Sequence, residues 1–180
     1  MTRDESAQPA PYRLRALCEG KPHVIDDVMF ELTSDLATLV LSHTHEQSLA
    51  SHNVGGWRSS DKFFDWPDPA IQTFVATLSR DFLLGCKASG WAMVNRHGSH
   101  HARHNHGGCG VLSGVFYVDP GGGSSPGTVF EIPQIEQPAV DLEVPAKRGR
   151  LVLFPSGMWH RVPIYYGSKP RITIAFNVYI

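Results

Sequence analysis

After residue 85 the chain becomes a series of short apolar runs separated by clusters of glycine, proline and aspartate. Runs of this length, rich in β-branched and aromatic residues, are typical of strands, and the clusters between them are typical of turns. Many short strands at close spacing predict a β-sandwich or jelly roll. The expected strands are residues 91–95, 111–118, 128–132, 150–154, 159–163 and 171–179.

The first half of the chain follows a helical period instead. Asp26 or Asp27 can cap a first helix, and Pro67 can start a second. Short strands are also expected at residues 12–17 and 23–25. The fold class is therefore α+β, with N-terminal helices packed on one sheet of a jelly roll. The apolar positions, three or four residues apart, are Leu32, Leu36, Leu39 and Val40, then Ile71, Phe74, Val75, Leu78, Phe82 and Leu83.

Composition narrows the class of protein. Residues 1–11 are polar and include two prolines, so we expect a disordered tail followed by a single domain over residues 12–180. The 16 basic and 17 acidic residues nearly cancel, which argues against nucleic acid or an anionic membrane as partner. There is no apolar run of about 20 residues and no leader pattern, and the three cysteines are widely spaced. These features favour a cytoplasmic protein.

Five of the ten histidines lie between residues 97 and 106. His104 and His106 are two positions apart, so on a strand both side chains would point to one face and could reach one metal ion. Imidazole suits iron, zinc, copper and nickel, and His160 is the expected third ligand. His97, His100 and His101 lie in a predicted loop with glycine and serine and are weaker candidates. The alternative is a solvated histidine cluster, with His160 hydrogen-bonded in the core.

Arg171 begins the last predicted strand and shares one face with Thr173. A guanidinium that points into a barrel is costly unless it is paired with an anion. Its planar fork matches a carboxylate, and the Thr173 hydroxyl could add a hydrogen bond. The alternative is an arginine in solvent at an exposed strand end.

An ordered series of motifs runs from about residue 53 to residue 180. It comprises GGWRS at 55–59, WAMVNR at 91–96, HNH at 104–106, LSGVFYV at 112–118, GRLVLFPS at 149–156, HRV at 160–162 and RITIAFN at 171–177. This series resembles the 2-oxoglutarate/Fe(II)-dependent oxygenases, and most closely a bacterial and phage branch of them. The resemblance implies a double-stranded β-helix.

The same resemblance implies a site and an activity. Fe(II) would be held by His104, His106 and His160, with no catalytic residue beyond the metal centre. The cosubstrate 2-oxoglutarate would place its far carboxylate against Arg171 and Thr173. The enzyme would use O2 to oxidise a small molecule, such as an amino acid or a biosynthetic intermediate. Further inward contacts to the cosubstrate or substrate would come from Asn95, Tyr117 and Asn177.

Position 106 departs from the wider superfamily, which has a carboxylate there. Three interpretations remain: His106 is the ligand, a carboxylate from Asp119 or Glu131 replaces it, or the position is open to water or halide. Two other functions also remain. One is a cupin-like three-histidine metal oxygenase that is independent of 2-oxoglutarate, and the other is a non-catalytic metal- or ligand-binding β-domain. The long segment 42–66 is expected to cover the substrate.

Overall fold

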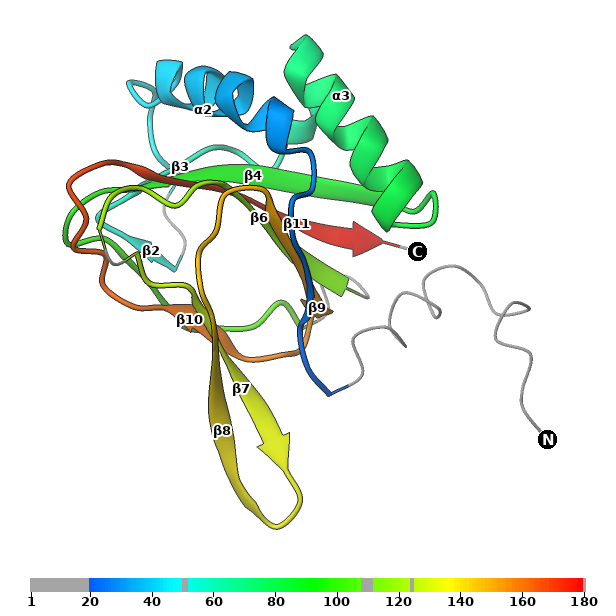
Figure 1. Ribbon diagram of the computed structural model, residues 1–180, viewed down its shortest axis with the longest axis vertical. Helices are drawn as coiled ribbons and strands as arrows, with labels where there is room; N and C mark the ends of the chain where they lie inside the picture. The colour runs from blue at the N-terminus through cyan, green and yellow to red at the C-terminus, as the bar shows by residue number, and fades with distance from the viewer. Residues whose placement is uncertain (1–19, 50–51, 108–111, 124, 180) are drawn as a thin grey trace.

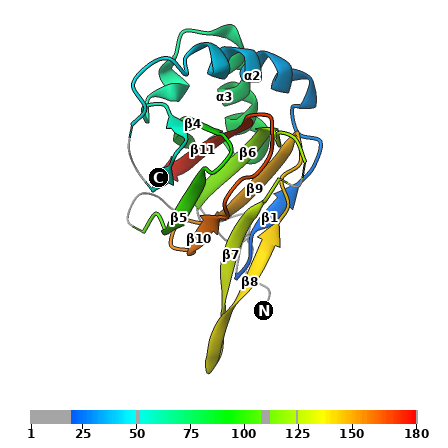
Figure 2. The same ribbon diagram turned by 90° about the vertical axis from the view of Figure 1, so that its left-hand side faces the viewer.

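A computed structural model describes residues 20–49, 52–107, 112–123 and 125–179. The expected tail at residues 1–11 and the expected strand at 12–17 lie outside these residues. Two antiparallel sheets face each other, and the helices cover the outer side of one of them (Figures 1 and 2). The α+β jelly roll is therefore confirmed.

The six-stranded sheet has the order β1-β9-β6-β11-β4-β3, and the five-stranded sheet has the order β2-β5-β10-β7-β8. Seven expected strands are confirmed as β1, β4, β6, β7, β9, β10 and β11, with small shifts at their ends. The sequence did not predict β2, β3, β5 or β8. The strands are β1 (His23–Ile25), β2 (Asn53–Val54), β3 (Trp57–Arg58), β4 (Lys87–Asn95), β5 (His100–His104), β6 (Leu112–Asp119), β7 (Thr128–Gln134), β8 (Gln137–Val144), β9 (Arg150–Pro155), β10 (His160–Val162) and β11 (Arg171–Tyr179).

Both helices begin later than expected. Helix α2 (Thr33–Ser42) follows a 3-10 turn, η2 (Phe30–Leu32), and the Thr33 hydroxyl donates to the Phe30 carbonyl at 2.6 Å. The predicted cap at Asp26 or Asp27 is wrong, because the Asp26 carboxylate pairs with Arg150 at 2.6 Å. Helix α3 (Pro69–Thr77) begins two residues after Pro67, where the Asp68 side chain accepts the Ala70 N–H at 2.8 Å.

Two short helices complete the helical layer. One is η3 (Phe63–Asp65), which lies within the long segment between α2 and α3, and the other is the π-helix η4 (Leu78–Phe82), which continues α3. The main core lies between this layer and the six-stranded sheet. Fully buried members on the helical side include Leu36, Phe63 and Phe74, and the sheet contributes Phe116 and Phe176.

Strand β11 lies in the middle of the six-stranded sheet, paired with β4 and β6 over nearly its whole length. Its even-numbered side chains, from Ile172 to Val178, enter the main core. Its odd-numbered side chains point the other way, towards the second sheet, because side chains alternate along a strand. Arg171, Thr173, Ala175 and Asn177 therefore share the inner face of the jelly roll, and all four are buried.

The β7–β8 hairpin extends well beyond the jelly roll (Figures 1 and 2). Residues 137–143 of β8 are exposed, and only Val144 at its end is buried. Where β7 enters the barrel its residues are buried, from Thr128 to Phe130. The hairpin therefore has one end in the second sheet and one end in solvent.

Candidate metal centre and adjoining pockets

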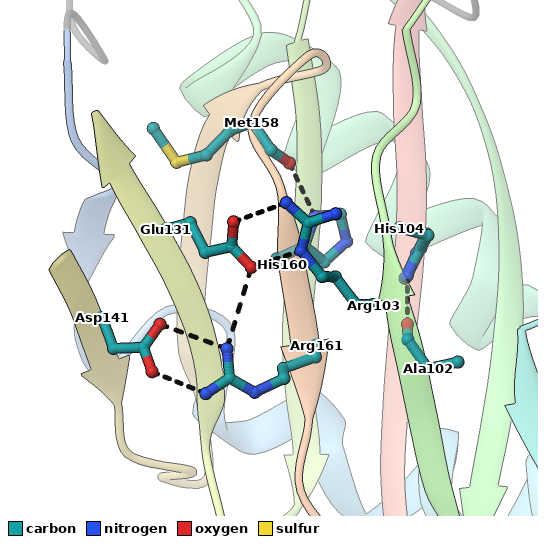
Figure 3. Close-up of polar contacts among 8 residues, drawn as sticks. All are labelled: Ala102, Arg103, His104, Glu131, Asp141, Met158, His160 and Arg161. Carbon is teal, nitrogen blue, oxygen red and sulfur yellow. Dashed lines mark hydrogen bonds and ion pairs between the residues drawn. The ribbon is translucent and has the colours of Figure 1, made fainter. Parts of the chain in front are cut away.

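Three imidazoles meet inside the jelly roll. One nitrogen from each of His104, His106 and His160 lies within 4.8 Å of the other two. His104 ends β5 and is the register partner of His160, the first residue of β10 (Figure 3). His106 follows β5, where its backbone N–H donates to the Ser156 carbonyl at 2.7 Å. The pair His104–His106 is thus not carried by one regular strand, as the sequence suggested, but it reaches the same place.

Each ring is held through Nδ1. His104 Nδ1 lies 2.8 Å from the Ala102 carbonyl, and His160 Nδ1 lies 2.9 Å from the Met158 carbonyl (Figure 3). A carbonyl only accepts, so both nitrogens carry the proton and donate it. His106 Nδ1 donates to the Asn177 side-chain oxygen at 2.8 Å. This leaves Nε2 of each ring free to act as a ligand, the usual arrangement of metal-binding histidines.

The three imidazoles are neutral at pH 7. Burial, with smaller contributions from the neighbouring imidazoles, lowers the pKa of His160 to about 3 and that of His104 to about 4. Burial also lowers the pKa of His106. Neutral imidazole is the form that binds a metal ion, so no proton has to be removed near neutral pH.

A second group of three histidines in the described part of the chain also brings its nitrogens together. One nitrogen from each of His52, His101 and His104 lies within 4.8 Å of the other two. The rings of His52 and His104 are nearly parallel, at 9°, with centroids 4.6 Å apart. Lone pairs lie in the ring planes, so stacked rings direct them side by side rather than at one ion. In the first group every pair of rings is inclined by at least 34°. His104, His106 and His160 are therefore the better candidate for a metal site.

The two carboxylates considered as alternative ligands lie elsewhere. Glu131 is on the outer face of the second sheet, where it accepts two hydrogen bonds from Arg103 at 2.6 and 2.7 Å (Figure 3). Asp119 accepts the Gly121 N–H at 2.8 Å in the turn after β6. Neither carboxylate is grouped with the imidazoles.

A narrow inner pocket of about 30 Å³ adjoins the three imidazoles and contains Arg171 and Thr173. Arg171 is 1% exposed, and its Nε and the Thr173 hydroxyl are buried with no hydrogen-bond partner among the described residues. Complete burial lowers the pKa of the guanidinium, and none of the ion pairs found in the described chain involves it. A buried guanidinium whose Nε has no partner, beside a buried hydroxyl in the same state, fits the binding of an anion. The donor set therefore fits a metal-bound dicarboxylate.

The other three expected contacts do not line this pocket, although each lies beside a residue that does. Tyr117 is fully buried, its hydroxyl lies 2.7 Å from Thr128 Oγ1, and the Arg171 guanidinium carbon lies 5.3 Å from its ring centroid. Asn95 is the register partner of Arg171, and its amide donates to Asn53 at 3.4 Å. Asn177 lies against His106, as described above.

An outer pocket of about 280 Å³ lies beside the same imidazoles and is much the larger of the two. Its wall includes Arg58, whose guanidinium carbon lies 4.7 Å from the centroid of the Trp91 ring and which pairs with Asp61. Four residues line both pockets: Trp91, His101, His104 and His106. The histidines therefore form part of the boundary between the pockets.

Sequence reasoning missed His52 and His101. The sequence analysis placed His101 in a loop, but it lies in β5 and is 7% exposed. His101 and His104, three residues apart, pair with Val162 and His160, which are only two apart, so β5 contains a bulge. The bulge turns both histidines inward. His52 precedes β2 and carries no local signal in the sequence.

Comparisons with known proteins agree with this geometry. The family model described as "Putative 2OG-Fe(II) oxygenase" matches residues 89–177. No curated protein matches the chain. Among solved structures, a Pseudomonas putida prolyl-4-hydroxylase is similar with a TM-score of 0.72 at 16% identity, covering 95% of this chain and 98% of that one. A Trichoplax adhaerens prolyl hydroxylase, solved with a hypoxia inducible factor peptide, has a TM-score of 0.68 at 14% identity, covering 99% and 94%. The non-heme alpha ketoglutarate dependent epimerase SnoN from nogalamycin biosynthesis has a TM-score of 0.67 at 14% identity, covering 93% and 81%.

The fold is thus that of the 2-oxoglutarate-dependent oxygenases. The chain belongs to the family of Fe(II)- and 2-oxoglutarate-dependent oxygenases that the matching model describes. The family implies Fe(II) as cofactor, 2-oxoglutarate as cosubstrate, and O2 and a substrate as reactants. No helix of the described residues has the length and apolar character that would take it across a membrane.

Proposed function

We propose that this oxygenase, acting as a single domain over residues 12–180, oxidises a small molecule such as an amino acid or a biosynthetic intermediate. His104, His106 and His160 would hold Fe(II), and Arg171 with Thr173 would hold the far carboxylate of 2-oxoglutarate. One observation carries the site assignment. Three neutral imidazoles line a narrow pocket that also contains the buried guanidinium of Arg171, whose Nε has no hydrogen-bond partner among the described residues.

Bound Fe(II), with 2-oxoglutarate and O2, would supply the oxidising chemistry. Three neutral imidazoles leave a divalent ion with its full charge, which favours an anionic chelator. Arg171 and Thr173 would fix the other end of that chelator, so the protein orients the cosubstrate at both ends. Asn95, the register partner of Arg171, and Tyr117, whose ring centroid lies 5.3 Å from the Arg171 guanidinium carbon, would act on the cosubstrate through Arg171.

Asn177 would act through His106. Its side-chain oxygen accepts from His106 Nδ1 at 2.8 Å and from the Ser113 hydroxyl at 2.7 Å. This arrangement holds the ring orientation and the tautomer in which Nε2 is free. We therefore assign Asn177 to positioning of the metal ligand rather than to cosubstrate contact.

The outer pocket is the proposed site of the substrate. A volume of about 280 Å³ is near the lower end of the range for small-molecule sites, which supports a compact substrate. The similar solved proteins include an enzyme described from nogalamycin biosynthesis and prolyl hydroxylases. Segment 42–66, expected to cover the substrate, contributes Arg58 and Asp61 to this wall. It is not structureless, because β2, β3 and η3 lie within it.

The two alternative functions are less well supported. An oxygenase that is independent of 2-oxoglutarate would leave Arg171 without an anion. A non-catalytic domain would not need a buried guanidinium beside histidines whose Nε2 atoms are free to bind a metal ion. Family membership also favours the 2-oxoglutarate-dependent enzyme.

The test compares wild type with Arg171→Leu in binding 2-oxoglutarate to the Fe(II)-loaded protein without O2, and in forming succinate with O2. Loss of one partner of a buried charge pair should weaken 2-oxoglutarate binding about 30-fold or more. Binding of 2-oxobutyrate, which has no far carboxylate, should not change. Equal 2-oxoglutarate affinity and equal succinate formation in both proteins would reject the role of Arg171.

A further inference from the structure

His101 lies at the boundary of the two pockets but is not one of the three proposed metal ligands. The bulge in β5 turns it to the inner face, where its ring centroid lies 4.5 Å from that of His104. It is 7% exposed, and its Nε2 is buried without a hydrogen-bond partner in the described part of the chain. A buried polar nitrogen left in this state is costly, so binding of a molecule that accepts a hydrogen bond from it is favourable.

The choice of partner follows from where His101 lies. It lines the inner pocket together with Arg171 and Thr173, the groups proposed to hold the far carboxylate of the cosubstrate. Its ring, however, stacks on His104, at the metal end of that pocket. A donor at this end would meet the part of a 2-oxo acid that binds the metal.

We infer that His101 is a cosubstrate-binding residue, whose Nε2–H donates a hydrogen bond to the metal-bound carboxylate of the 2-oxo acid. The inference rests on the proposed function and extends it. The protein would then recognise both ends of the cosubstrate with its own side chains, with His101 at the metal end and Arg171 at the far end. Nothing in the ligand set of three histidines requires this contact.

A competing possibility is that His101 is itself a metal ligand, together with His52 and His104. The nearly parallel stacking of His52 on His104 disfavours that arrangement. The two possibilities differ in what His101 affects. A cosubstrate contact changes the affinity for the 2-oxo acid, whereas a metal ligand changes the affinity for the ion.

The experiment measures binding rather than turnover. Wild type, His101→Leu, His101→Gln and Arg171→Leu are loaded with Fe(II) without O2 and titrated by calorimetry with 2-oxoglutarate and, separately, with 2-oxobutyrate. Both acids have the same metal-binding end, but only the first has a far carboxylate. His101→Leu should lower the binding affinity for both acids by the same factor, about 10-fold or more. His101→Gln, which keeps a donor, should recover part of this loss, and Arg171→Leu should weaken only 2-oxoglutarate.

His100→Leu is the matched control. His100 is the neighbouring residue on β5 and lines neither pocket, so both acids should bind this variant as they bind wild type. The affinity of each variant for Fe(II) alone is measured in the same way, and thermal unfolding checks that each variant folds.

The outcomes separate the two proposals. If wild type binds Fe(II) but neither acid, the proposed function fails and this inference fails with it. If 2-oxoglutarate binding depends on Arg171 but not on His101, only this inference is overturned. It is also overturned if His101→Leu lowers the affinity for Fe(II) itself, or if it lowers the affinity only for 2-oxoglutarate, the acid that has the far carboxylate. A loss shared by both acids, with Fe(II) affinity intact, supports it.

Discussion

His104 and His160 are register partners on adjacent antiparallel strands, and their ring centroids lie 4.2 Å apart. Strand pairing therefore sets the distance between two proposed ligands that are far apart in the sequence. The carbonyls of Ala102 and Met158, each two residues before its histidine, fix the two rings in the same way (Figure 3).

Replacing His160 with alanine should abolish tight metal binding, because two imidazoles remain where three converge. We expect the dissociation constant for Fe(II), or for Ni(II) as a redox-stable probe, to rise at least 100-fold. Loss of a residue that only orients a ligand typically costs 10- to 100-fold, and loss of the ligand itself should cost more. Calorimetry measures it, with His97→Ala, at the exposed turn before β5, as the control. Unchanged affinity in the His160 variant would contradict the proposed site.

Asn177→Leu tests the orientation of His106. The substitution removes the Asn177 oxygen at 2.8 Å from His106 Nδ1 and leaves the Ser113 hydroxyl at 2.9 Å, and loss of an orienting partner typically costs 10- to 100-fold in metal affinity. We expect a loss in that range, measured for Fe(II) or Ni(II). Thr38→Ala on the exposed surface of α2 is the control. A loss in 2-oxo acid affinity without a loss in metal affinity would instead make Asn177 a direct cosubstrate contact.

The metal-free protein should lose stability in mild acid. The unfolded chain takes up protons at its histidines near pH 6.5, whereas burial keeps the folded pKa of His104 at about 4 and that of His160 at about 3. Between these values the unfolded state binds more protons, so the free energy of unfolding falls as the pH falls, by up to about 1.4 kcal/mol per pH unit for each histidine.

Denaturant unfolding of the metal-free protein between pH 7 and pH 4 measures this slope. His160→Leu removes one of the contributing groups, so its slope should be shallower than that of wild type. A wild-type curve that is flat over this range would show that these imidazoles are not held neutral.

Glu131→Gln tests whether Glu131 serves only in the ion pair with Arg103 or also as a metal ligand. Glu131 joins Arg103 to the outer face of the second sheet, and the side chain of Arg103 is 50% exposed. Exposed pairs of this kind contribute little, so we expect a loss of less than about 1 kcal/mol in stability. Metal affinity should not change. A large loss of metal affinity would restore Glu131 as a candidate ligand.

Gly114→Ala should destabilise the fold. A Cβ at this position would lie 2.2 Å from the tip of the Phe176 ring, and overpacking of a core typically costs about 1–3 kcal/mol. Urea unfolding measures the loss. The double variant Gly114→Ala with Phe176→Leu should be less destabilised than the sum of the single variants. Simple additivity would show that the two positions do not contact each other.

The sequence predicted those strands whose apolar side chains face a core. Strand β5 was missed because its sequence, HHARH, contains no large apolar residue, and its inward positions are imidazoles. Strand β8 was missed because it is exposed along almost its whole length and contains Pro138, so only its pairing with β7 makes it a strand. Local patterns cannot show a strand whose stability comes from its partner.

The site residues, too, divide into those that local sequence patterns could indicate and one that depends on the partner strand. His104, His106, His160 and Arg171 could be proposed from spacing and from the resemblance to a known family. His101 could not, because a bulge shifts its side chain to the inner face, and bulges depend on the partner strand. The one available signal in the sequence was the three-residue spacing of His101 and His104.

The alternation along β11 has a consequence for how the chain can change. Deleting or inserting one residue before Thr173 would exchange the two faces of the strand, moving the guanidinium and hydroxyl towards the helices and isoleucines into the cosubstrate site. Substitutions in β11 are thus tolerable one face at a time, whereas length changes are not. Variation in length among descendants of this sequence is therefore expected at the β7–β8 tip, which can be shortened or extended without altering the frame of either face.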